Sequence, residues 1–135
     1  MTRSFSRIFA LPILAAAIAV SAPIAGQAQG FKSAKSGRYQ KIDAYYGWNN
    51  DCSHKLIDVQ IVQKPKNGSV EPRVVTERIR SDAAIGTSGK CAGKRTKAVA
   101  VYYKSKSGYR GIDSFRVRMS VGGQSKYFNY TVRVN

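Results

Sequence analysis

The chain has 135 residues, of which 23 are Lys or Arg, seven are Asp or Glu and one is His, so its formal net charge is +16. That length allows one folded domain. One His and seven scattered carboxylates exclude most metal-dependent and acid–base enzyme classes, and the excess of positive charge points to an anionic partner or surface.

The first 28 residues have the pattern of a signal peptide. A basic start is followed by an apolar run at 8–20, and Gly26 and Ala28 place small residues before a cleavage site after Ala28. A membrane anchor is the alternative, but the run is shorter than the roughly 20 residues that span a bilayer, and Pro12 interrupts it. We therefore predict a cleaved signal peptide at 1–28 and a secreted or periplasmic location. The remaining 107 residues hold 21 basic and seven acidic side chains, a balance of +14.

Cys52 and Cys91 are the two cysteines of the chain. In an oxidising compartment they allow one intramolecular pairing, and neither has the neighbouring Cys of a redox or zinc motif. We predict a structural disulfide. A free reactive thiol or a disulfide-linked dimer are the alternatives.

The domain is predicted over 39–135, after a Gly-, Ser- and Lys-rich flexible leader at 29–38. Runs of alternating or extended character predict strands between turn-forming segments. A long loop is expected at 81–97, pinned by the disulfide. The expected strands, in chain order, are 39–48, 55–63, 69–80, 98–104, 114–121 and 126–134.

The last two strands have the clearest pattern. Apolar residues alternate with Arg116 and Arg118 along the first of them, and Gly122-Gly123 is a two-residue hairpin signal that would place Val117 opposite Phe128. In the third strand, Pro72 restricts the chain to a sheet edge or a bulge. Several short strands without a helical period predict an all-β antiparallel sandwich with one disulfide.

Four motifs resemble the bacterial cadherin-like and immunoglobulin-like repeat family over about 59–135. They are Pro65-x-x-Gly68 followed by Val70, Val101-Tyr102-Tyr103, Gly108-Tyr109-x-Gly111-x-Asp113-Ser114-Phe115, and a closing Thr131-Val132-x-Val134. The resemblance implies an immunoglobulin-like Greek-key β-sandwich, which serves in that family as an extracytoplasmic adhesive or spacer module. The chain has room for one copy, and the segment 78–97 is an atypical insert.

Residues of the third motif have structural interpretations. Gly108 and Gly111 permit backbone angles that other residues avoid. The Tyr109 hydroxyl can pin the turn, as a tyrosine corner does. The Asp113 carboxylate can accept backbone N–H bonds at the strand entry.

The sequence offers little for catalysis. His54 follows Asp51, Cys52 and Ser53, but residues adjacent in sequence do not form a triad unless geometry brings them together. Zinc needs three or four ligands, and calcium needs six to eight oxygens that no acidic run supplies. We predict a non-enzymatic protein without metal or cofactor; a small hydrolase built around His54 is a remote alternative.

Two basic groups are the candidate polyanion-binding residues. Basic side chains mixed with exposed Tyr suit an anionic polysaccharide, lipopolysaccharide or membrane surface, whereas secretion disfavours nucleic acid. The alternative is that the charge only keeps the protein soluble. The groups are Lys90, Lys94, Arg95 and Lys97 in the disulfide loop, and Arg116, Arg118, Tyr127 and Arg133 on the outward face of the last strands.

These observations predict a bacterial, secreted or periplasmic, non-catalytic immunoglobulin-like module that binds, or acts structurally, at an anionic envelope or matrix. The alternative function is binding of an envelope protein, as an inhibitor or subunit, through exposed aromatic residues that include Tyr45, Tyr46 and Trp48.

Overall fold

The computed structural model describes residues 31–80 and 88–135, so the predicted signal peptide and residues 81–87 lie outside the described residues. The described part is all-β apart from a single helical turn. Its elements are β1 (Lys32–Ala34), β2 (Tyr39–Tyr45), β3 (Gly47–Trp48), β4 (His54–Lys55), β5 (Asp58–Gln63), β6 (Gly68–Arg78), α1 (Ser88–Cys91), β7 (Arg95–Ser105), β8 (Gly111–Val121) and β9 (Gln124–Val134).

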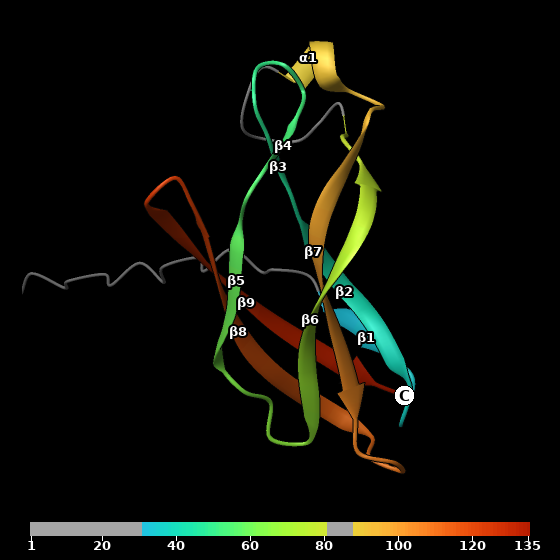
Figure 1. Cartoon of the computed structure of the whole chain (residues 1–135). Coiled ribbons are helices and arrows are strands. Elements are labelled where there is room, and N and C mark those ends of the chain that lie inside the picture. Colours follow the sequence, from blue (N-terminus) through green and yellow to red (C-terminus); the bar gives the residue numbers. More distant parts are fainter. Residues whose placement is uncertain (1–30, 81–87) are drawn as a thin grey trace, which may run out of the picture.

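The strands form two main sheets and a small hairpin (Figure 1). A four-stranded sheet has the order β1-β9-β8-β5, and a three-stranded sheet has the order β2-β7-β6. All pairs are antiparallel except β1 with β9. The short β3–β4 hairpin and α1 lie at one end of the molecule, beyond the main sheets (Figure 1).

The main core lies between the two sheets. Three aromatic rings form its centre, with the Tyr103 and Phe115 centroids 6.2 Å apart and those of Phe115 and Tyr130 5.1 Å apart. Such ring pairs add stability beyond the area that they bury. The buried core residues are Ala34, Ile42, Tyr45, Val101, Tyr103, Phe115, Val117, Tyr130, Val132 and Val134.

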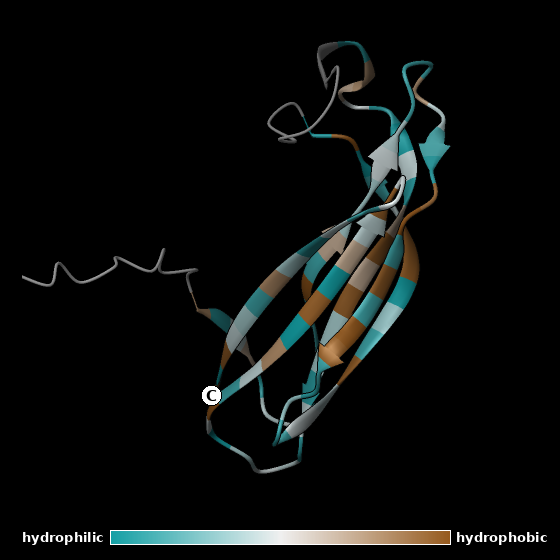
Figure 2. Cartoon of the chain, turned by 90° about the vertical axis from the view of Figure 1, so that its left-hand side faces the viewer, coloured by the Kyte–Doolittle hydropathy of each residue, from teal (hydrophilic) through white to brown (hydrophobic). Residues whose placement is uncertain are grey.

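The β8–β9 hairpin has the predicted register. Val117 lies opposite Phe128, and Arg118 lies opposite Tyr127. The turn glycines have φ angles of 55° and 78°, both positive, as a tight two-residue hairpin of this kind requires. In Figure 2, hydrophobic and hydrophilic residues alternate along the strands nearest the viewer, because every second side chain faces the core.

A bulge explains why the sequence of β2 does not alternate cleanly. The pairing of β2 with β7 shifts between Lys41 and Asp43. The extra residue lets both Ile42 and Tyr45 enter the core. Pro72 lies on β6, at the edge of its sheet, as predicted.

The Asp113 side chain joins three parts of the chain. It is buried, and its carboxylate accepts the backbone N–H groups of Lys66 at 3.0 Å and Asn67 at 2.9 Å. It also accepts its neighbour's N–H from Ser114 and the hydroxyl of Tyr103, each at 3.0 Å. The predicted capping role is confirmed, and the donors from the β5–β6 turn extend it to a link between the two sheets.

The turn before β8 also follows the prediction. Gly108 and Gly111 have φ angles of 79° and 136°, and the Tyr109 hydroxyl donates to the carbonyl oxygen of Ile112 at 2.8 Å. A Cβ atom at Gly111 would lie 3.1 Å from that hydroxyl. The glycine therefore allows the tyrosine to close over the turn.

Three predicted boundaries were wrong. The segment 29–38 was predicted as a flexible leader, but it contains β1, which pairs with β9 in parallel and buries Ala34. Three residues are too few to show a period in the sequence. The predicted loop at 81–97 ends earlier, because β7 begins at Arg95. The strand predicted at 55–63 is interrupted after β4, and β5 begins at Asp58.

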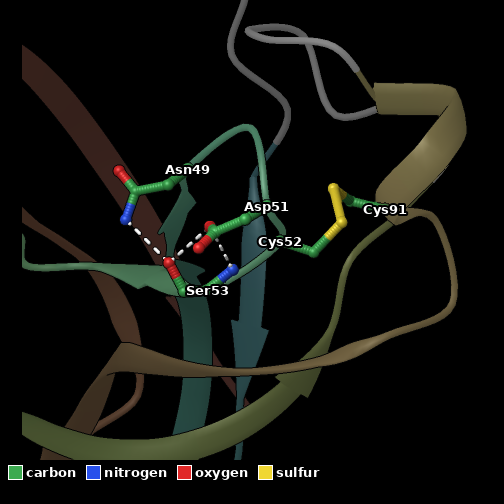
Figure 3. Close-up of a disulfide and its surroundings, with 5 residues drawn as sticks. All are labelled: Asn49, Asp51, Cys52, Ser53 and Cys91. Atoms are coloured by element: carbon green, nitrogen blue, oxygen red, sulfur yellow. Dashed lines mark hydrogen bonds between the residues drawn. A yellow bond between two sulfur atoms is a disulfide. The ribbon is translucent and has the colours of Figure 1, made fainter.

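Cys52 and Cys91 form the predicted disulfide, with a Cα–Cα distance of 5.4 Å (Figure 3). It anchors a second small core with buried Ile79, against which Tyr46 and Trp48 pack. A disulfide is consistent with an oxidising, extracytoplasmic location. No helix in the described ranges has the length and hydrophobicity of a membrane span.

Candidate functional site: an arginine platform

The outer face of the four-stranded sheet gathers four of the predicted residues. Arg116 and Arg118 alternate with core residues on β8, and Tyr127 and Arg133 do so on β9. The register places all four on one face, because Arg118 pairs with Tyr127 and Arg133 pairs with outward-facing Ile112. We call this face, defined by Arg116, Arg118, Tyr127 and Arg133, the arginine platform.

Neighbouring side chains hold two arginines in place. The Arg116 guanidinium carbon lies 4.6 Å from the ring centroid of Tyr127, and that ring is 48% exposed. Arg118 is half-buried and donates to the side-chain oxygen of Gln60 at 2.6 Å. Its Nε atom is buried and has no hydrogen-bond partner. The platform therefore presents two guanidinium groups that neighbouring side chains position.

The positive charge of the platform is not neutralised. In the described ranges, neither Arg116, Arg118 nor Arg133 forms an ion pair with a carboxylate. The nearest carboxylate along this face is Asp58 on β5, which accepts a hydrogen bond from Gln60 at 2.8 Å. A cation–π contact orients a guanidinium without cancelling its charge, so these groups remain available to an anion.

The platform is long rather than compact. Arg133 lies six residues along β9 from Tyr127, which corresponds to about 20 Å of strand. Its guanidinium lies 5.2 Å from the exposed ring of Phe31, so an arginine–aromatic pair stands at either end. Side chains of Ser114, Asn129 and Thr131 fall on the same face between them.

The other predicted basic group does not join this platform. Lys90 lies on α1, Lys94 follows it, and Arg95 and Lys97 belong to β7 in the other sheet. Two of these residues also line different depressions of the surface: Arg95 lines a basic cavity, whereas Lys97 lines an apolar groove. The prediction that they share one disulfide loop was wrong, since β7 extends further than its apolar pattern indicates.

The aromatic residues of the alternative prediction are not a free surface. Tyr45 is buried in the main core, and Tyr46 and Trp48 are half-buried against the disulfide. The burial of Tyr46 and Trp48 follows from the second core, which the sequence did not reveal.

Two partners of the platform residues were not predicted from the sequence: Gln60, which bonds to Arg118, and Phe31, which contacts Arg133. The outward position of Gln60 between Val59 and Ile61 was a usable signal for the first. Phe31 gave none, because β1 was not predicted.

A second cation–aromatic cluster lies on the outer face of the three-stranded sheet. The Arg73 guanidinium lies 4.3 Å from the ring centroid of Tyr39 and hydrogen-bonds to Glu71. Hydrogen bonds from Arg73 and Tyr39 hold the pKa of the Glu71 carboxyl below its usual value. Here a carboxylate neutralises the arginine, so this cluster is a weaker candidate for anion binding than the platform.

Asp51 and Cys52, the neighbours that the sequence places next to His54, have other partners. Cys52 is in the disulfide, and the Asp51 carboxylate accepts the hydroxyl and backbone N–H of Ser53, which hold its pKa below the usual value (Figure 3). Within the described ranges, no three His, Cys, Asp or Glu residues lie close enough to hold a metal ion.

Comparisons with known proteins give no match. No family model, no curated protein and no solved structure is similar to the chain.

Proposed function

We propose that this protein is a secreted or periplasmic, non-catalytic module that binds an anionic polysaccharide, including that of lipopolysaccharide, through the arginine platform. The observation that carries the proposal is a row of un-neutralised guanidinium groups about 20 Å long, paired with exposed aromatic rings. An extended polymer can contact all of these groups at once, whereas a small anion reaches only one end. Aromatic faces and interspersed hydroxyl and amide groups also suit sugar rings.

We further propose an immunoglobulin-like Greek key of the bacterial cadherin-like kind as the scaffold. Constant-type immunoglobulin domains place strands B, E and D on one sheet and C, F and G on the other. The orders β2-β7-β6 and β5-β8-β9 support the same arrangement here. Tyr109 in its turn is a second supporting feature. The Cys52–Cys91 bridge departs from the usual B–F disulfide, because it joins two connections rather than two strands.

The competing explanation is that basicity only confers solubility or general attraction to an anionic envelope. The two explanations differ in which cations matter. General attraction depends on net charge, so removing any two exposed cations has the same effect. A platform requires particular arginines.

Binding to heparin at several salt concentrations distinguishes the two. We expect Arg116→Ala/Arg118→Ala to weaken binding about tenfold or more, because charge-assisted hydrogen bonds are lost. Lys64→Ala/Lys66→Ala removes the same charge from the exposed β5–β6 turn and is the matched control. Equal losses in the two double variants would leave only general attraction.

Protein binding is a second candidate function, favoured by an apolar groove rather than by the predicted aromatics. Leu56 is 82% exposed and Val74 is 74% exposed, and both line a groove of about 270 Å³ whose charged lining residues, Lys55 and Lys97, are basic. This chemistry suits an acidic protein segment with an aliphatic anchor. Retention of an envelope protein at high salt, lost in Leu56→Ser but not in Val62→Ser, would support it.

A further inference from the structure

A basic cavity has no lining residue in common with the arginine platform. Its volume is about 730 Å³, and β1, β2, β6 and β7 contribute to its wall. Five basic side chains and two carboxylates are among the lining residues. The basic residues, which define the cavity, are Lys32, Lys41, Arg78, Arg80 and Arg95.

Both carboxylates already have partners. Glu77 forms an ion pair with Lys41. Asp43 accepts the hydroxyl of Tyr130 at 2.8 Å and the backbone N–H of Ala44 at 2.9 Å. Lys32, Arg78 and Arg95 form no ion pair with a carboxylate in the described part of the chain, so their positive charge is in excess.

The decisive feature is a pair of like charges. Arg78 and Arg95 are directly opposite each other on β6 and β7. Like charges in that position destabilise a sheet. Arg78 donates to the carbonyl oxygen of Gly93 at 3.0 Å, whereas the side chain of Arg95 makes no hydrogen bond or ion pair in the described part of the chain. An anion between the two guanidinium groups would replace repulsion by two attractive contacts.

We propose that this cavity binds a compact oxyanion of the phosphate or sulfate class, held by Arg78, Arg95 and Lys32. Guanidinium groups match the geometry of such oxyanions and donate two parallel hydrogen bonds to them. The oxyanion is either a free ion or an ester group on a larger molecule. This site shares no residue with the arginine platform, so either one can fail without the other.

The test compares thermal unfolding and calorimetric binding of the mature chain in inorganic phosphate, in sulfate and in sodium chloride of equal ionic strength. We expect saturable binding of phosphate or sulfate and a rise in unfolding temperature that chloride does not produce. Arg95→Gln should bind at least tenfold more weakly. Lys64→Ala/Lys66→Ala, far from the cavity lining, should bind as the unchanged chain does.

Arg95→Gln also separates an anion site from a structural role. It removes the repulsion and no described hydrogen bond, so its unfolding temperature in chloride should not fall, while the rise caused by phosphate disappears. Glucose 6-phosphate distinguishes a free oxyanion from an ester group on a larger molecule. Tighter binding of glucose 6-phosphate than of inorganic phosphate indicates an ester group, and equal binding of the two indicates a free ion. Equal effects of chloride and phosphate, or unchanged phosphate affinity in Arg95→Gln and Lys32→Ala, would overturn the proposal.

Discussion

Replacing Asp113 tests how the fold is held together. One carboxylate oxygen accepts the N–H groups of Lys66 and Ser114, and the other accepts the N–H of Asn67 and the hydroxyl of Tyr103. In Asp113→Asn, the amide oxygen can keep the first two bonds. The Tyr103 hydroxyl can turn and accept from the new NH₂ group, but the Asn67 N–H then faces a donor.

The Asn67 N–H therefore loses its acceptor, and the remaining hydrogen bonds are no longer made to a charged carboxylate. Each unmade bond at a buried group costs about 1–3 kcal/mol, so we expect Asp113→Asn to lower the free energy of unfolding by about 2 kcal/mol. Asp113→Ala removes all four bonds and leaves the buried Tyr103 hydroxyl without a partner. We expect it to cost about 4 kcal/mol, less than the sum of four bonds because burial of a charge is also relieved.

Urea unfolding of the disulfide-bonded chain, followed by circular dichroism, measures both changes. Asp58→Asn is the control, because Asp58 is exposed and accepts from a single side chain, and it should change stability by less than about 0.5 kcal/mol. If Asp113→Ala does not fold, the Asn variant still gives an answer. An Asp113→Asn change as small as that of the control would refute the argument.

Three further predictions concern stability. Cys52→Ala/Cys91→Ala should lower the free energy of unfolding by about 4 kcal/mol, since the bridge closes a loop of 39 residues; a loss below about 1 kcal/mol by urea unfolding would contradict this. Gly68→Ala should cost about 1–3 kcal/mol by the same assay, because its Cβ would overlap the Lys104 carbonyl oxygen, and an unchanged stability would be unexpected. Burial raises the pKa of three tyrosines above the unfolded value of about 10, so the stability that they contribute is complete below that pH and is lost as the pH rises through the folded values. These tyrosines are Tyr45, Tyr103 and Tyr130. Absorbance at alkaline pH should show that they ionise only when the chain unfolds; their ionisation in a folded chain, together with the remaining tyrosines, would contradict this.

The sequence predicted the parts of the fold that local patterns encode. The alternation along β8 and β9 and the two turn glycines predicted the hairpin register. A shift of one residue would turn the apolar side chains from the core to the solvent, so only one register buries them. The disulfide was predicted from two cysteines in a chain that was expected to be secreted. These signals also located Arg116 and Arg118 on the outer face.

Other features depend on contacts between distant segments. β1 is three residues long and exists through parallel pairing with β9, about 100 residues away. The cross-strand pair of Arg78 and Arg95 requires the β6–β7 register, which no local pattern gives. The burial of Trp48 likewise depends on the disulfide and Ile79. Composition identified the charge, but tertiary structure decides which cations share a surface.

Mapping a bound oligosaccharide onto the chain tests the central proposal most directly. Amide chemical shifts of a chain of residues 29–135 would be recorded during titration with a heparin hexasaccharide, with neutral maltohexaose as control. The platform predicts saturable changes concentrated at Arg116, Arg118, Tyr127, Asn129 and Arg133, and none with maltohexaose. Changes spread evenly over both sheets, or confined to the basic cavity, would contradict it.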